Sequence, residues 1–270
     1  MSVPKKIIEE HPELSRTILS GYRGSIAHGM WVSPKEKTSV DDKDVMYVVV
    51  PEIDYYYGYP AGFGSNRVFP SNGTKEIKQD EWDIVAYEAK KFIGLLAQGN
   101  PNVLAMLWLK PQYYLTVTNV GQMLLDNRKL FIGRHVYKSF TGYAYGQLHR
   151  MTYTAGNGHL GEKRKKLVQE FGFDCKNAAH LIRLLRMGIE FLKDGELQVE
   201  REDASQLLEI KRGEWALDKV VSEADRLFAS AEQAYLSSSL PSGVDSKAIN
   251  HLSTTIIQMA LEEFLNGETQ

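Results

Sequence analysis

The sequence predicts an α+β fold, with a small mixed sheet flanked by helices and then a helical region. Three observations lead to this prediction. Short β-branched and aromatic runs alternate with helical stretches up to about residue 130. Beyond that point, most segments have apolar residues at helical spacing. The 270 residues suffice for one large domain or two modest ones. We therefore expect an α/β domain over residues 1–130 and a helical domain over residues 131–270 that closes a cleft.

The first elements are punctuated by glycine and proline. Residues 5–14 are typical of a short helix, and RTILSGY at 16–22 is typical of a strand that stops at glycine. DVMYVVVP at 44–51 is a β-branched run that ends at proline, which favours a buried strand. Residues 53–73 are rich in tyrosine, glycine and proline without periodicity, so we expect a long loop or an irregular hairpin.

The rest of the first half continues the alternation. Residues 74–87 favour a pair of strands, and EAKKFIGLLAQG at 88–99 has apolar residues at helical spacing and a glycine stop. A second helix is expected at 100–108 after an Asn-Pro-Asn cap, and YYLTV at 113–117 favours one more short strand.

The second half consists mainly of amphipathic helical segments. They lie at 119–131, 137–151, 163–171, 175–195, 204–213, 217–236 and 249–266.

Charge and composition limit the functions to consider. A net charge of −2 and a pI near 6.4 give no global attraction for nucleic acid, so phosphate recognition requires local basic clusters. The chain has no apolar signal core near its start and no apolar run of about 20 residues, so we expect no membrane partner and a cytoplasmic location, in the host cytoplasm if a phage encodes it. The single cysteine, Cys175, excludes an internal disulfide and a multi-cysteine zinc site, and is best interpreted as a small buried hydrophobe.

Two carboxylates one residue apart open the valine-rich strand. Residues two apart in a strand point to the same side, so Asp42 and Asp44 share one space and require a counter-ion. Magnesium suits this arrangement because it binds through one or two carboxylates together with substrate phosphates. The turn at Gly24-Ser25 offers close backbone approach, exposed N–H groups and a hydroxyl to phosphate oxygens. Together, the turn and the acids indicate a nucleoside triphosphate, although each motif alone is weak.

This order of motifs resembles the signature of the DNA polymerase β-type nucleotidyltransferase superfamily. The segments GSIAHG, VDDKDV, DIVAYEAKKFIGLLAQGNPNVLAMLW and DCKNAAHLIRLLRMGIEFLKDGELQV are similar to a predicted nucleotidyltransferase family that includes RNA ligase-associated proteins of bacteria and phages. The similarity extends over residues 20–220. The fold that it implies is a polymerase β-like nucleotidyltransferase domain followed by a helical domain.

The resemblance also implies site residues. Gly24 and Ser25 would hold the triphosphate, and Asp42 and Asp44 would bind two Mg²⁺ ions, with Mn²⁺ as a substitute. These ions would activate the acceptor and stabilise the leaving pyrophosphate in an in-line attack on the α-phosphorus.

A third carboxylate normally comes from a neighbouring strand in this superfamily. Asp83 in EWDIVAY is the candidate, with Asp80 and Glu81 as neighbours that the sequence does not separate from it. The alternative interpretation of Asp83 is a helix N-cap before IVAYEAKKF.

Two departures from the superfamily pattern weaken the match. The 16 residues between Ser25 and Asp42 exceed the usual spacing, and Lys43 stands between the acids where an apolar residue is usual. A lysine that points outward is compatible with the site, whereas one that points inward would compete with metal.

The helix expected at 175–195 has a polar stripe. At about 100° per residue, Lys176, His180, Arg183 and Glu190 share one face. Its basic members are candidate contacts for the triphosphate or the acceptor, and the alternative is a solvated face that pairs with nearby acids.

Three further features have a functional and a structural interpretation. His28, three residues after Ser25, is a candidate phosphate contact or an ordinary polar turn residue. The run 162–166 is a candidate nucleic-acid contact or a solvated helix start. The tyrosines at 55–57 either stack on a base or pack within their loop.

These observations favour a metal-dependent nucleotidyltransferase that binds ATP or another nucleoside triphosphate and transfers its nucleoside monophosphate to an acceptor, with an RNA or DNA end in a repair reaction as one candidate. The alternatives are a catalytically inactive nucleotide-binding regulator, a nucleic-acid-binding partner of an RNA repair ligase, and a transferase that modifies antibiotics or proteins. The sequence determines neither the base, the acceptor nor the oligomeric state.

Overall fold

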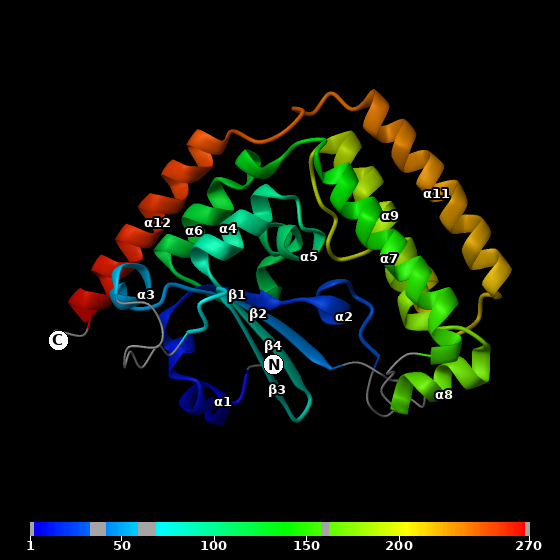
Figure 1. Ribbon diagram of the computed structural model, residues 1–270, viewed down its shortest axis with the longest axis horizontal. Coiled ribbons are helices and arrows are strands. Elements are labelled where there is room, and N and C mark those ends of the chain that lie inside the picture. The colour runs from blue at the N-terminus through cyan, green and yellow to red at the C-terminus, as the bar shows by residue number, and fades with distance from the viewer. Residues whose placement is uncertain (1–2, 33–41, 59–68, 158–161, 268–270) are drawn as a thin grey trace.

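The computed structural model describes residues 3–32, 42–58, 69–157 and 162–267, and at 152–157, 162–164, 166, 167 and 267 it describes the backbone alone. The described part forms a five-stranded mixed sheet with the strand order β3-β4-β2-β1-β5 (Figure 1). The strands are β1 (Thr17–Tyr22), β2 (Lys43–Val49), β3 (Thr74–Gln79), β4 (Trp82–Glu88) and β5 (Tyr114–Val117).

The central pair of strands is parallel, and the other pairs are antiparallel. β2 and β4 run in parallel in a register that pairs Asp44 with Asp83, whereas β1 is antiparallel to both β2 and β5. β3 and β4 form the expected hairpin. A crossover must connect parallel strands, so β2 and β4 are separated by a long segment that begins with the short helix α3 (Ile53–Tyr57).

Alternation along β2 sends its valines to two different cores. Val45 and Val49 pack with Ile84 on one face, near the N-terminal segment. Met46 and Val48 pack on the other face, which helices cover. Because side chains alternate in a strand, Asp44 belongs to the helix-covered face and Lys43 to the opposite face.

The remaining helices follow in chain order. The α-helices are α1 (Lys5–Glu10), α2 (Gly24–Ala27), α4 (Ala89–Ala97), α5 (Pro101–Leu104), α6 (Asn119–Asp126), α7 (Val136–Asn157), α8 (Glu162–Phe171), α9 (Cys175–Asp194), α10 (Ala204–Lys211), α11 (Leu217–Ser237) and α12 (Ser246–Gly267). The 3₁₀ helices are η1 (Pro12–Arg16), η2 (Ala105–Trp108), η3 (Pro111–Tyr113) and η4 (Arg128–Phe131).

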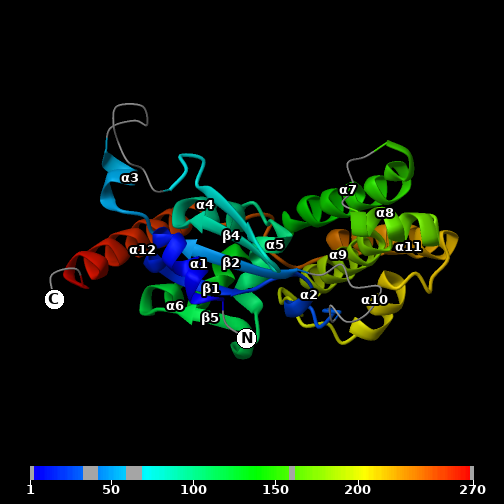
Figure 2. The ribbon, with the colours of Figure 1, turned by 90° about the horizontal axis from the view of Figure 1, so that it is seen from below.

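The helical region surrounds α9. Helices α7, α10 and α11 all pack against it, and their apolar side chains form a core of their own. Figure 2 shows this bundle to one side of the sheet, with α2 facing it. Cys175, the first residue of α9, is fully buried, and burial raises the pKa of its thiol to about 12.

The last helix departs from the expected division at residue 130. After α11, the chain crosses back, and α12 packs against α4 and α6 beside the sheet (Figure 1). Ile256 and Leu261 of α12 share one core with Phe92 of α4 and Phe191 of α9. The N-terminal unit is therefore completed by the C-terminal helix, and a boundary at residue 130 does not separate two independent cores.

The mixed fold with a helical second half was predicted correctly from the sequence, and one segment differs. Residues 53–57 form a helical turn within the expected loop, while 59–68 lie outside the described residues. Within the described part, no helix combines the length and the apolarity that a bilayer crossing requires.

Candidate active site

Two carboxylates face the same side at the start of the parallel strand pair. Asp44 in β2 and Asp83 in β4 are directly paired in register, and both side chains are about three-quarters buried. The two strands are far apart in sequence, so the sheet alone brings these carboxylates together. They lie at the edge of the core formed by Met46 and Val85, on the helix-covered face.

The turn between β1 and α2 closes against these acids. Gly24 has a φ of +61°, and a Cβ built on it would lie 2.3 Å from Oδ2 of Asp44. Both facts require glycine at this position. Ser25 follows, and its Oγ is buried without a hydrogen-bond partner among the described residues. A phosphate oxygen could accept the hydrogen bond that this buried hydroxyl does not make within the protein.

Arg23 joins the turn to the carboxylates. Its backbone N–H donates to the Asp44 carbonyl at 3.0 Å, which fixes the end of β1 against β2. Its Nη2 donates to Oδ1 of Asp83 at 3.1 Å and lies 3.6 Å from Oδ1 of Asp44. A single guanidinium nitrogen thus bridges the two acids.

The surroundings perturb the protonation of Asp44. The pKa of this carboxyl is raised to about 6: burial is the main cause, the charges of Arg23 and Lys176 oppose the rise, and the negative charges of Asp83 and Asp42 add to it. The charge of Lys176, in the first turn of α9, therefore acts on the Asp44 carboxyl. Because burial and like charges disfavour the ionised form, the group is stabilised by any added cation.

The neighbours of the acids occupy the positions that strand alternation requires. Nζ of Lys43 lies 2.5 Å from Oε1 of Glu81 and 5.0 Å from the centre of the Trp82 ring, on the face away from Asp44. The lysine is therefore outside the site, as the sequence requires if the acids are functional. Asp80 lies in the β3–β4 turn with a φ of +53°.

These positions distinguish the candidates for the third carboxylate. Asp83 lies beside Asp44, whereas Glu81 is engaged by Lys43. The alternative that Asp83 caps a helix is wrong, because α4 begins at Ala89 and Glu88 caps it. Asp42 is exposed, just before β2.

The fit to a metal is partial. Among the described residues, no three histidine, cysteine or carboxylate side chains converge closely enough to hold an ion. Asp44 and Asp83 nevertheless provide two carboxylates beside an unsatisfied hydroxyl, and magnesium commonly uses only one or two carboxylates together with phosphate and water. The donor set fits a metal that arrives with a polyphosphate better than one bound by protein alone.

A comparison with known protein families found a match. A family model described as the RNA repair pathway DNA polymerase beta family matches residues 5–254. The chain belongs to this family. The match confirms the resemblance to polymerase β-type nucleotidyltransferases, and it extends through the helical region to α12. Comparison with the curated proteins found no match.

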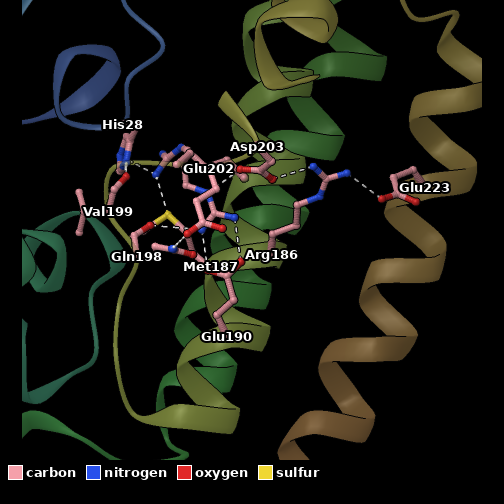
Figure 3. Close-up of polar contacts among 11 residues, drawn as sticks. His28, Arg186, Met187, Glu190, Gln198, Val199, Glu202, Asp203 and Glu223 are labelled. Atoms are coloured by element: carbon pink, nitrogen blue, oxygen red, sulfur yellow. Dashed lines mark hydrogen bonds and ion pairs between the residues drawn. The ribbon is translucent and has the colours of Figure 1, made fainter. Parts of the chain in front are cut away.

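Two of the expected nucleotide contacts have other roles in this member of the RNA repair pathway DNA polymerase beta family. His28 is buried, its Nδ1 lies 2.7 Å from the Val199 carbonyl, and its Nε2 lies 2.6 Å from Nη1 of Arg183 (Figure 3). The expectation that His28 binds phosphate is wrong in this arrangement, since protein atoms engage both ring nitrogens. The alternative interpretation, that His28 is a polar turn residue with a structural role, agrees better with these contacts.

Arg183 is likewise not a surface cation. It is 2% exposed, contacts Sδ of Met187 as well as His28, and burial lowers its pKa to about 9. The expectation that it reaches a triphosphate is wrong because α9 is the central helix of its bundle, and neighbouring segments cover Arg183 itself. His28 and Arg183 instead brace α2 against α9.

A network of ion pairs stabilises the segment that contacts His28. Arg201 pairs with Glu190 at 2.5 and 2.8 Å and with Asp203 at 2.8 Å, while Arg186 connects Asp203 at 2.7 Å to Glu223 at 3.0 Å (Figure 3). The network joins α9, α10 and α11 around the segment that carries Val199. It therefore fixes the acceptor for His28 behind the turn.

The other candidate residues that the sequence suggested differ in their surroundings. The charge of Lys176 acts on Asp44, and His180 follows it one turn later, half-buried. Within 162–166, only the side chain of Lys165 is described, and it is exposed. Tyr56 donates to Oε1 of Glu88 at 2.7 Å, which supports packing, while Tyr57 is 83% exposed.

Two cations beside the acids, Arg23 and Lys78, were not predicted from the sequence. Nζ of Lys78, in β3, lies 3.6 Å from Oδ2 of Asp83. The available signal was electrostatic, because clustered acids need nearby cations and Arg23 immediately precedes the Gly-Ser turn.

Proposed function

We propose that this protein is a nucleotidyltransferase that transfers a nucleoside monophosphate from a triphosphate to an RNA end. The observation that carries the proposal is the convergence of Asp44 and Asp83 against the Gly24-Ser25 turn. The family supports the same chemistry, since its name combines RNA repair with DNA polymerase beta. An acceptor oxygen would bond to the α-phosphorus while the bond from that phosphorus to pyrophosphate breaks.

The turn and the nearby cations would bind the triphosphate. The N–H groups and hydroxyl at Gly24 and Ser25 would hold phosphate oxygens, and the absence of a hydrogen-bond partner for the buried Ser25 Oγ among the described residues supports this role. Lys176 would add a point charge from the helical region. A site built from both parts of the chain would position the phosphates before reaction.

The carboxylates would hold Mg²⁺ or Mn²⁺. Asp44 and Asp83 are the ligands that we propose, with Asp42 available from the exposed strand start. When bound, the metal would neutralise phosphate charge and favour ionisation of the attacking hydroxyl.

A second candidate function is a nucleotide-binding regulator without turnover. The observation that favours it is Arg23, whose guanidinium lies between the two carboxylates. If Arg23 never leaves this position, a polyphosphate could bind at the turn, whereas a metal ion could not bind between the two carboxylates. The two functions therefore differ in metal dependence.

The experiment incubates the purified chain with each α-³²P-labelled triphosphate, Mg²⁺ or Mn²⁺, and RNA oligonucleotides with free 3′ ends. We expect label transfer that Asp44→Asn and Asp83→Asn each reduce by at least about a hundredfold, in the range found when an electrostatic contact to the transition state is lost. The matched control is Asp80→Asn, which removes a nearby charge in the adjacent turn and should retain activity.

Label transfer that survives both substitutions would exclude the proposed site. Metal-independent binding of triphosphate without transfer to any acceptor would favour the regulator. Transfer to protein or to a small molecule, but not to RNA, would retain the chemistry and reject the proposed acceptor.

A further inference from the structure

Arg23 is incompletely bonded in the position that it occupies. Only Nη2 reaches the carboxylates, at 3.1 and 3.6 Å, and Nε is buried without a partner among the described residues. An arginine that serves only to bind carboxylate normally does so through two parallel N–H bonds. The observed contact therefore uses little of the donor capacity of the guanidinium.

The charges around Asp44 and Asp83 explain why Arg23 lies beside these carboxylates. Without a metal, Asp44 and Asp83 are offset by Arg23, Lys78 and Lys176. A divalent ion between the same carboxylates would add two positive charges and repel the guanidinium. Lys78 is 71% exposed and can turn to solvent, whereas Arg23 is anchored at the edge of the turn.

A triphosphate held at the turn would be an alternative partner for Arg23. Arg23 directly precedes Gly24 and Ser25, so its side chain originates beside the phosphates that the turn would bind. A guanidinium suits phosphate through paired N–H donors, and the buried Nε supplies one that is unused.

We infer that Arg23 exchanges counter-ions: it occupies the carboxylate pair when the site is empty and moves to the triphosphate when metal enters. The inference rests on the proposed function and deepens it. Arg23 is then a positioning residue that makes metal and nucleotide binding depend on each other. Metal alone must displace the guanidinium, whereas metal with triphosphate gives it a new partner, and the two ligands bind cooperatively.

The test measures binding, not turnover. Mn²⁺ binding is followed by electron paramagnetic resonance with and without the four nucleoside triphosphates that carry a methylene between the α- and β-phosphorus. In Arg23→Gln, we expect Mn²⁺ alone to bind about tenfold more tightly and triphosphate with Mn²⁺ to bind about tenfold or more weakly, the scale of one charge-assisted hydrogen bond. The mutual enhancement of the two ligands in the wild type should therefore shrink.

The matched control is Lys78→Gln, which removes another cation beside Asp83. Because that ammonium is mainly exposed, each affinity should change by less than about fivefold. Arg23→Lys tests the same exchange in a variant that keeps the charge, and intermediate values are expected. Circular dichroism verifies that each variant is folded.

The remaining outcomes separate the two proposals. If Arg23→Gln weakens both ligands, or tightens Mn²⁺ without weakening triphosphate, the exchange is wrong and the proposed function stands. If neither the wild type nor any variant binds Mn²⁺ and triphosphate, the proposed function itself fails.

Discussion

His28 is a buried imidazole in cationic surroundings. Its Nδ1–H donates to the Val199 carbonyl, its Nε2 accepts from Nη1 of Arg183, and the charge of Arg201 also acts on the ring. Burial, followed by the charge of Arg183, lowers the pKa of His28 well below its ordinary value, and the Val199 carbonyl only partly opposes this. The neutral ring is therefore the form that the fold accommodates, and protonation must oppose folding.

This environment predicts a loss of stability in mild acid. The unfolded chain binds a proton at His28 as pH falls through about 6.5, whereas the folded chain does not. The contribution of His28 to stability is therefore complete above that value and falls below it, by up to about 1.4 kcal/mol per pH unit. We expect His28→Asn to reduce the loss in urea unfolding between pH 7.5 and 5.5. His251→Asn, at an exposed position, is the control, and an unchanged slope in His28→Asn would contradict the prediction.

At the scale of the element, two helical glycines have opposite surroundings. Gly121 in α6 lies against β1, and a Cβ there would be 2.0 Å from the carbonyl oxygen of Ile18. Gly94 in α4 has no such neighbour within 4 Å. The first glycine permits a close approach of helix and strand, while the second only adds backbone entropy to the unfolded chain.

Substitution by alanine should separate these roles. Gly94→Ala is expected to raise the free energy of unfolding by about 0.4–1 kcal/mol, because alanine restricts the unfolded chain. Gly121→Ala is expected to lower it by about 1–3 kcal/mol, the usual cost of inserting a group into a packed contact. Urea denaturation monitored by circular dichroism measures both, and equal effects of the two substitutions would show that α6 tolerates displacement from β1.

At the scale of the whole molecule, one core connects the two halves. Ile256 in α12 is fully buried in the cluster that also contains Leu19 of β1 and Phe140 of α7. The C-terminal helix is thus needed to cover α4 and α6, and the sheet and the bundle share apolar side chains. We expect them to unfold together, since neither can lose this core alone.

Shortening one buried side chain at the centre of α12 tests whether the two halves unfold together. Ile256→Ala is expected to lower the free energy of unfolding by about 2–5 kcal/mol, the typical cost of a buried cavity. Tryptophan fluorescence and far-ultraviolet circular dichroism should report one coincident transition. Glu263→Ala, at an exposed position of the same helix, should change stability by less than about 0.5 kcal/mol. Separate transitions for the two probes would indicate independent halves.

Local pattern was sufficient for the elements and for part of the site. The β-branched run predicted β2, and the glycine stop predicted the end of α4, where Gly99 has a φ of +71°. The Gly24 turn also followed from its residue type. Arg183 was misplaced because helical periodicity gives a face but not the number of neighbours that cover it. Arg23 was missed since its partners come from two other strands.

The sequence by itself determined the alternation along β2, which separates Asp44 from Lys43, and it determined the family to which the chain belongs. Only the tertiary structure decided that Asp83 lies beside Asp44, that Arg23 joins them, and that His28 is enclosed. The physical reason is that side-chain direction within a strand is a local property, whereas strand pairing and burial depend on contacts between segments distant in sequence.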